Sequence, residues 1–102
     1  MDFVKTTTRT AVMTLQDGEV PELEIQSGLG CMILHLDHET RRILQEMISS
    51  GARRVTTRRS IIEISDDPRF ERVLSIQSAG SSRMPLNDEN QKALVEMLAH
   101  RF

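Results

Sequence analysis

The stretch of this chain best equipped for chemistry is CMILHLDHE, residues 31–39. It brings together ligand types that bind zinc or iron, namely Cys31, His35, Asp37, His38 and Glu39. Cys31 and His35 are expected on one face of a strand, whereas Asp37 and His38 begin a helix, so these side chains do not converge. We therefore predict no metal site and no cofactor here. A metal or redox role for Cys31, His35 and His38 stays open as the alternative.

Catalytic motifs are missing from the sequence. The glycines of QSGLG (residues 26–30) lack the G-x-G-x-x-G spacing, and no helix follows at once, which is typical of a β-turn. Cys31 has no partner for nucleophilic chemistry beyond His35, and a cysteine on a strand is usually a packing residue. The chain is therefore predicted not to be an enzyme.

Phosphate binding is the second chemistry that the residues could support. Thr-Thr-Arg occurs at residues 7–9 and again at residues 56–58, and hydroxyls and guanidinium groups bind phosphates. Candidate nucleic-acid contacts are Arg9, Arg53, Arg54, Arg58 and Arg59. The alternative interpretation is an exposed loop and strand edge whose charge prevents aggregation.

Composition weighs against nucleic acid as the main partner. The net charge is −2, there is no Trp or Tyr, and none of the three Phe is expected on an exposed sheet face. A surface on which bases could stack is therefore not predicted. Charge is uneven, however: residues 1–52 carry 4 basic and 8 acidic side chains, and residues 53–102 carry 9 and 7.

These residues are set in a chain that repeats itself. TTRTAVMTLQD (7–17) matches TTRRSIIEISD (56–66), and LEIQS (23–27) matches LSIQS (74–78). LDHETRRILQEM (36–47) then matches LNDENQKALVEM (86–97). Three matches in the same order at offsets near fifty residues indicate an internal duplication. We predict a single domain, residues 1–102, built of two related halves at about 6–51 and 55–102.

Each half has the pattern of three strands followed by a helix. Alternating apolar residues define the strands: Ala11, Met13, Leu15, Leu23, Ile25, Met32, Leu34 and Leu36, with Ser60, Ile62, Ile64, Leu74, Ile76, Ser82, Met84 and Leu86 in the second half. Asp37 and Asn87 are typical helix N-caps, and Gly51 is a typical C-cap. The predicted fold class is α+β: a tandem β-β-β-α repeat forming a mainly antiparallel sheet with two helices on one face, in a pseudo-twofold arrangement.

The face of the sheet that points away from the helices is expected to be mixed in polarity. Branched apolar residues there are more frequent than a solvated face normally carries. The predicted interface residues are Val12, Ile33, Ile61, Val73, Gln26 and Gln77. Because most soluble oligomers are twofold homodimers, a second copy of the chain is the expected partner.

The end of each half also resembles a known group of proteins. A short strand is followed by Leu, two residues, Glu, four residues and Leu, at Leu36, Glu39 and Leu44 and at Leu86, Glu89 and Leu94. This pattern is similar to the repeat of the Whirly, Pur-alpha and positive-cofactor-four group, which bind single-stranded nucleic acid. The resemblance implies a tandem strand–helix fold and nucleic-acid binding. The sequence has Arg41-Arg42 and Gln91-Lys92 where that group often has an aromatic residue.

Together these features predict a small non-enzymatic protein-interaction or regulatory module, homodimeric through the sheet face. The alternative is a nucleic-acid-binding protein, for single-stranded DNA or RNA or associated with transcription, that uses the arginine cluster. No apolar run of about 18 residues is present, so no membrane partner is expected. A single cysteine, Cys31, and a start without the apolar core of a secretory signal favour the cytoplasm.

Overall fold

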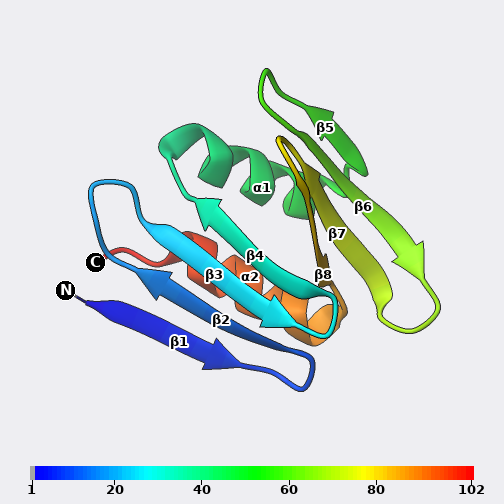
Figure 1. The fold of residues 1–102 in the computed structure, drawn as a ribbon, viewed down its shortest axis with the longest axis horizontal. Helices are drawn as coiled ribbons and strands as arrows, with labels where there is room; N and C mark the ends of the chain where they lie inside the picture. Colours follow the sequence, from blue (N-terminus) through cyan, green and yellow to red (C-terminus); the bar gives the residue numbers. More distant parts are fainter. Residues whose placement is uncertain (1) are drawn as a thin grey trace.

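A computed structural model describes residues 2–102 of the chain, and these residues form eight strands and two helices (Figure 1). The first repeat contains β1 (Phe3–Thr7), β2 (Ala11–Gln16), β3 (Glu22–Ser27), β4 (Gly30–His35) and α1 (His38–Ser50). The second contains β5 (Arg54–Thr56), β6 (Ile61–Asp67), β7 (Glu71–Gln77), β8 (Ser81–Pro85) and α2 (Asp88–Ala99).

The predicted α+β class and tandem strand–helix repeat are confirmed. Strands β1–β4 form one antiparallel sheet, here sheet A, and β5–β8 form a second, sheet B. The structure therefore has two sheets in place of one, and each repeat has four strands in place of three. β5 has only three residues, too few to show an alternating pattern in the sequence. β1 is an edge strand without a buried residue.

The Thr-Thr-Arg segments form the turns that open each repeat. In the β1–β2 turn the Thr8 hydroxyl accepts from the backbone N–H of Ala11 at 3.1 Å, and Thr8 N–H donates to the Ala11 carbonyl at 2.9 Å. The β5–β6 turn repeats both bonds between Thr57 and Ser60, at 3.0 and 2.8 Å. The duplicated threonines are thus turn residues, because their hydroxyls satisfy backbone groups that the tight turn leaves unpaired.

Both helices begin at the residues that the sequence predicts. The side chain of Asp37 accepts from the backbone N–H of Thr40 at 2.7 Å, and Asn87 accepts from Asn90 N–H at 2.8 Å. Gly51 ends α1 in the left-handed region at φ 75°, where a side chain would add strain.

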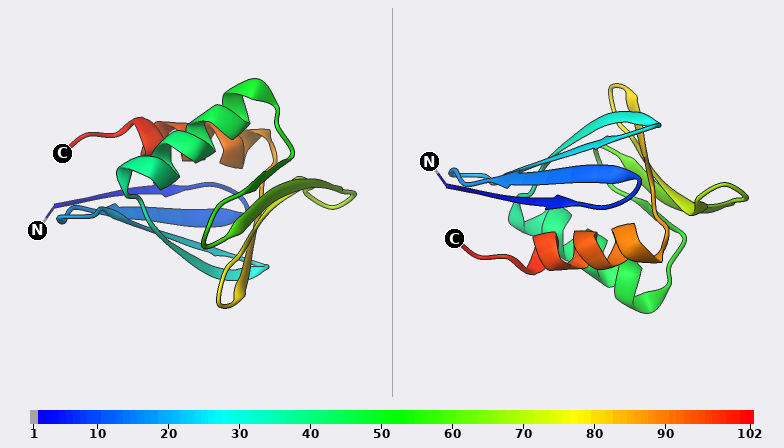
Figure 2. Two further views of the ribbon diagram at one scale, coloured as in Figure 1. Left: turned by 90° about the horizontal axis from the view of Figure 1, so that it is seen from above. Right: turned by 90° about the horizontal axis from the view of Figure 1, so that it is seen from below.

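The helices exchange partners between the two repeats. α2 contacts β2 of sheet A, α1 contacts β5 of sheet B, and the two helices contact each other. Figure 2 shows both helices on the same side of the sheets. In Figure 1, β2 and β6 run in opposite directions, as expected for repeats related by an approximate half-turn.

A single hydrophobic core fills the space between the sheets and the helices. It consists of apolar residues from the inner faces of both sheets and from both helices; fully buried members include Met13, Leu15, Leu23, Ile25, Met32, Leu36, Leu44, Met47, Leu74, Met84, Leu86 and Leu94. Because each helix covers the sheet of the other repeat, burial of this core requires both repeats.

Candidate functional site

Each sheet has an outer face, which points away from the helices. On sheet A, the outer rows of paired residues are Phe3–Gln16–Glu22–His35, Lys5–Thr14–Glu24–Ile33 and Thr7–Val12–Gln26–Cys31. On sheet B, they include Arg54–Glu63–Ser75–Arg83 and Thr56–Ile61–Gln77–Ser81. β4 and β8 lie next to each other, so the two outer faces adjoin (Figure 1).

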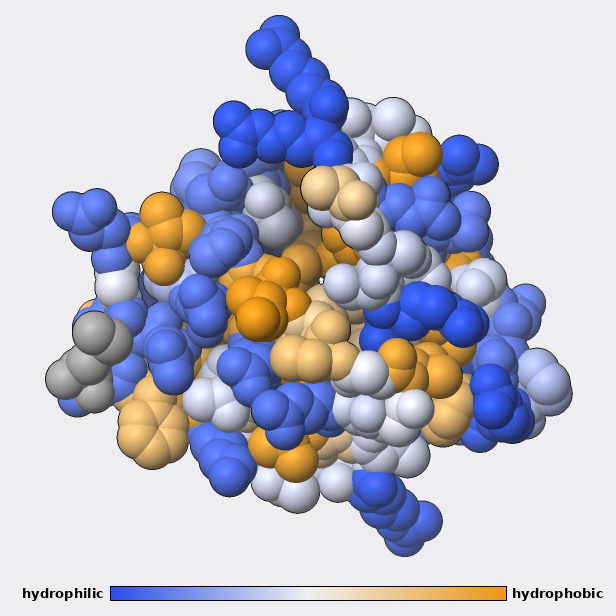
Figure 3. Space-filling model, in the orientation of Figure 1, coloured by the Kyte–Doolittle hydropathy of each residue, from blue (hydrophilic) through white to orange (hydrophobic). Residues whose placement is uncertain are grey.

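Most of the predicted interface residues lie on these outer faces. Ile33 is 53% exposed, Val12 and Ile61 are half-buried, and Gln26 and Gln77 are exposed. In Figure 3, apolar side chains interrupt a largely polar surface near the centre of this side of the molecule. The structure thus places these five residues on one side of the molecule, where a partner could contact them.

Val73 departs from this prediction. Its side chain is on the outer side of β7, opposite Pro85 and Ser65, but it is 0% exposed. The neighbouring strand β8 packs against β3 and β4, so this end of sheet B is buried where the two sheets meet. Alternation along one strand cannot reveal that contact, because it is made by the other repeat.

Phe3 is an outer-face residue that sequence reasoning missed. It is 63% exposed and pairs with Gln16 at the edge of sheet A. The prediction kept all three Phe off the exposed sheet face because it did not include β1. A short run of alternating residues, FVKTT, was the available signal.

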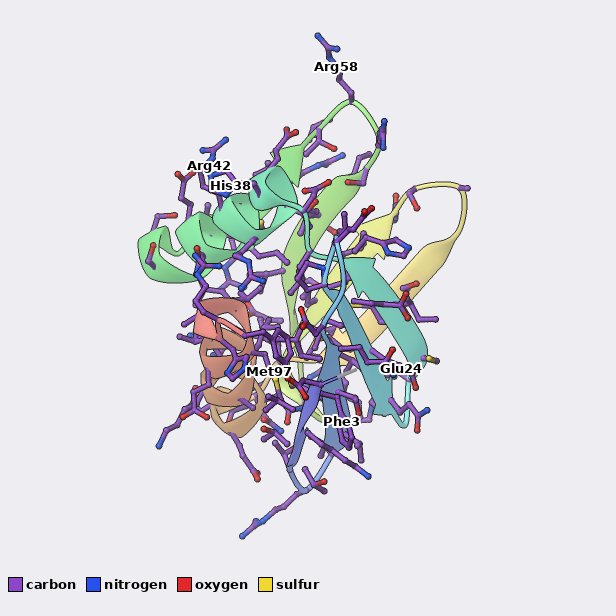
Figure 4. All side chains as sticks on the ribbon, turned by 90° about the vertical axis from the view of Figure 1, so that its left-hand side faces the viewer. Phe3, Glu24, His38, Arg42, Arg58 and Met97 are labelled. Atoms are coloured by element: carbon purple, nitrogen blue, oxygen red, sulfur yellow. The ribbon has the colours of Figure 1, made fainter. Side chains whose placement is uncertain are left out.

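The charged residues of the two outer faces are distributed differently. Sheet A presents Glu22 and Glu24 against Lys5. On sheet B, Arg54 and Arg83 lie in one row with Glu63, and the acidic pair Asp67–Glu71 lies at the far end of the face. Figure 4 shows Glu24 on the side of sheet A away from the helices. The basic residues of sheet B's outer face are thus confined to the Arg54–Arg83 row.

The five candidate arginines do not form one cluster. Arg58 and Arg59 lie in the β5–β6 turn, and Arg58 projects away from the molecule in Figure 4. Arg53 forms an ion pair with Asp66 at 3.1 Å, and Arg54 lies 4.0 Å from Glu63. Arg9 is in the β1–β2 turn, at the opposite end of the molecule (Figure 1). Only Arg58 and Arg59 are adjacent cations without an ion-pair partner among the described residues.

The structure separates the metal-ligand types that are adjacent in the sequence. Cys31 and His35 are exposed on the outer face of β4, where His35 Nδ1 lies 3.8 Å from Glu22 Oε2. His38 lies in the first turn of α1 and is exposed on the helix (Figure 4). Within residues 2–102, no group of three or more His, Cys, Asp or Glu side chains is placed to hold a metal ion.

Two buried polar side chains connect the repeats, and the sequence did not predict either. Asn90 of α2 is 0% exposed and bonds to the β1–β2 turn of the other repeat. Arg41 of α1 is 6% exposed and donates to the carbonyl oxygens of Leu98 and His100 at the end of α2. Burial lowers the pKa of Arg41, and the charge of Arg101 adds to the effect. Both residues satisfy backbone or hydroxyl groups that burial would otherwise leave unpaired.

Neither α1 nor α2, the helices of residues 2–102, is long and apolar enough to cross a membrane. Comparisons of this chain with models of known protein families, with curated proteins and with solved structures find no match.

Proposed function

We propose that this chain is a non-enzymatic protein-interaction module that forms a homodimer through its outer faces. The observation that supports it best is Ile33. Its side chain is 53% exposed in the middle of β4, on paired strands rather than in a loop. Val12 of sheet A and Ile61 of sheet B are half-buried on the same side of the molecule. Burial of such residues is the usual driving force for association.

One row of charges on each outer face favours a second copy as the partner. In a twofold dimer, sheet A of one copy can face sheet B of the other, and the symmetry repeats this contact. In the register that places Glu22 and Glu24 against the Arg54–Arg83 row, these rows are complementary in charge, and the acidic pair Asp67–Glu71 lies away from the contact.

Sedimentation equilibrium at micromolar concentrations, compared at low and high salt, tests this proposal. We expect a dimer whose affinity falls as salt rises, since exposed charges are screened. Ile33→Asp should weaken the dimer at least about tenfold without unfolding the monomer, because a buried charge is costly. Val20→Asp, at a residue that is 46% exposed in the β2–β3 turn, is the matched control. A monomer at all concentrations would contradict the proposal.

Nucleic-acid binding is the second candidate function, and one observation favours it. Arg58 and Arg59 occupy a hairpin tip, and Arg58 extends into solvent (Figure 4). The resemblance to the Whirly, Pur-alpha and positive-cofactor-four group points in the same direction. Titration with single- and double-stranded oligonucleotides at two salt concentrations tests it. Binding that falls steeply with salt and is lost in an Arg58→Gln, Arg59→Gln double variant would support this function. No binding at low salt would exclude it.

A further inference from the structure

The start of each helix faces the first hairpin turn of the other repeat, and we call this contact a joint. The two joints differ. In the closed joint, the start of α2 contacts the β1–β2 turn. Asn90 Nδ2 donates to the Thr10 hydroxyl at 2.7 Å and to the Pro85 carbonyl at 2.9 Å, and Asn90 Oδ1 accepts from the Thr8 hydroxyl. One side chain thus bridges the hairpin and the helix by offering donors and an acceptor together.

The equivalent joint of the other repeat is open. The start of α1 and the β5–β6 turn are separated by a cleft of about 740 Å³. At the position that matches Asn90, α1 has Thr40, whose shorter side chain also lines this cleft. The cleft volume is within the range of about 300–1,000 Å³ typical of small-molecule sites. Among the described residues, no side chain of α1 forms a hydrogen bond with the β5–β6 turn, in contrast to Asn90 of α2.

The walls of the cleft carry opposite charges. Asp37 and Glu39, at the start of α1, line one side, and Arg58 and Arg59 of the β5–β6 turn line the other, with His35 at the end of β4. No ion pair forms between these walls among the described residues. The pKa of Asp37 is lowered mainly by hydrogen bonds from Thr40 and further by the charges of Arg59 and His35. Asp37 is therefore a carboxylate at neutral pH, and the cleft has an acidic wall opposite a basic wall.

The interior of the cleft is aliphatic. Ile62 of β6, Ile76 of β7 and Ile43 of α1 line it between the two charged walls. Ile62 is buried, whereas Ile43 and Ile76 are half-buried and retain apolar surface that a ligand could cover. A matching ligand has a cationic end, an anionic end and an apolar body between them.

We propose that this cleft binds a small zwitterionic peptide, a dipeptide of aliphatic residues with free termini. Its carboxylate pairs with the Arg59 guanidinium, its ammonium group pairs with the Asp37 carboxylate, and its side chains pack on the isoleucines. A dipeptide suits the site better than a single ion, because its two termini can pair with both charged walls, which form no ion pair with each other among the described residues. Bound in this way, the ligand would bridge α1 and the hairpin as Asn90 does in the closed joint.

Isothermal titration calorimetry with Leu-Leu and two capped analogues tests the proposal. N-acetyl-Leu-Leu lacks the ammonium group, and Leu-Leu amide lacks the carboxylate. We expect Leu-Leu to bind and each capped form to bind at least about tenfold more weakly, since each loses one charge-assisted contact. Equal affinity of the three peptides, or no binding of Leu-Leu at about 10 mM, would overturn the proposal.

Three variants locate the site. Arg59→Gln and Asp37→Asn should each weaken Leu-Leu binding at least about tenfold. Asp37→Asn is a clean change, because Asn is an equally good N-cap and already caps α2 at Asn87. Arg42→Gln, on the exposed side of α1, is the matched control and should leave binding unchanged. Circular dichroism verifies that each variant is folded. Unchanged affinity in the folded Arg59 and Asp37 variants would overturn the assignment to this cleft.

Discussion

The side-chain amide of Asn90 donates a 2.7 Å hydrogen bond to the hydroxyl of Thr10, which lies 80 residues earlier in the chain. Since Asn90 belongs to the second repeat and Thr10 to the first, this bond holds a helix against the sheet of the other half. The bond is buried at its Asn90 end, where competition from water is weak.

Replacing Asn90 with Ala should therefore destabilise the fold. The change removes bonds to Thr8, Thr10 and Pro85 and leaves the Pro85 carbonyl without its partner. We expect a loss of about 2–4 kcal/mol in the free energy of unfolding, measured by urea denaturation. Lys92→Ala, at an exposed position of the same helix, should change it by less than about 0.5 kcal/mol. Equal effects of the two changes would mean that the bridge contributes nothing.

Arg41 and Gln45 should behave non-additively. Both donate to the carbonyl oxygen of Leu98, so either one alone still satisfies it. Arg41→Met should cost about 1–2 kcal/mol, because its bond to His100 is also lost, and Gln45→Ala less than about 0.5 kcal/mol. The double variant should lose about 1 kcal/mol more free energy of unfolding than the two single variants together, since the Leu98 carbonyl then has no donor. Strict additivity in chemical denaturation would show that the two donors act independently.

Asp37 should make the fold sensitive to acid. Hydrogen bonds from Thr40 lower the pKa of this carboxyl below the usual range of an aspartate. A group whose pKa is lower in the folded state stabilises the fold above its unfolded pKa, and this contribution is lost as the pH falls through the folded pKa. Asp37→Asn keeps the cap but does not titrate. As the pH falls from about 6 to about 3, the free energy of unfolding of Asp37→Asn should therefore rise relative to that of the wild type in urea denaturation. A difference that does not change with pH would contradict this cause.

Charge reversal tests whether sheet A of one copy faces sheet B of the other copy in the proposed homodimer. In the proposed dimer, Glu24→Lys would place a cation opposite Arg83 of the second copy, and Arg83→Glu would place an anion opposite Glu24. Each variant alone should dimerise roughly fivefold more weakly than the wild type, the scale of an exposed ion pair. An equimolar mixture should recover the wild-type affinity as a heterodimer, because both contacts are again between opposite charges. Sedimentation measures all three samples, and a mixture no tighter than its components would exclude this orientation.

Local patterns were enough to predict the repeat, the α+β class and the ends of the helices. Asp37, Asn87 and Gly51 act within one or two turns of their own position, so their roles can be recognised from sequence. The inner faces of β2, β3 and β4 follow from simple alternation. These features depend on neighbours in the chain.

The features that the sequence did not predict depend on the other repeat. Val73 is buried where the two sheets meet. Asn90 and Arg41 can be buried because they form hydrogen bonds with partners that are 80 and 57 residues away in the chain. The repeated Thr-Thr-Arg segments suggested phosphate binding from sequence, and the structure adds that the hydroxyls of Thr8 and Thr57 bond within their turns. The open cleft was also missed, since only a comparison of the two joints in space reveals it.

The exchange of helices has a consequence for how this architecture could arise and diverge. A single repeat would need the helix of a second copy to cover its sheet, so the two repeats resemble an obligate dimer joined into one chain. Because the repeats are joined, their sequences need not be identical. The contact between α2 and the β1–β2 turn can then be closed by Asn90, while the contact between α1 and the β5–β6 turn keeps a cleft. Two identical copies of one sequence could not differ in this way.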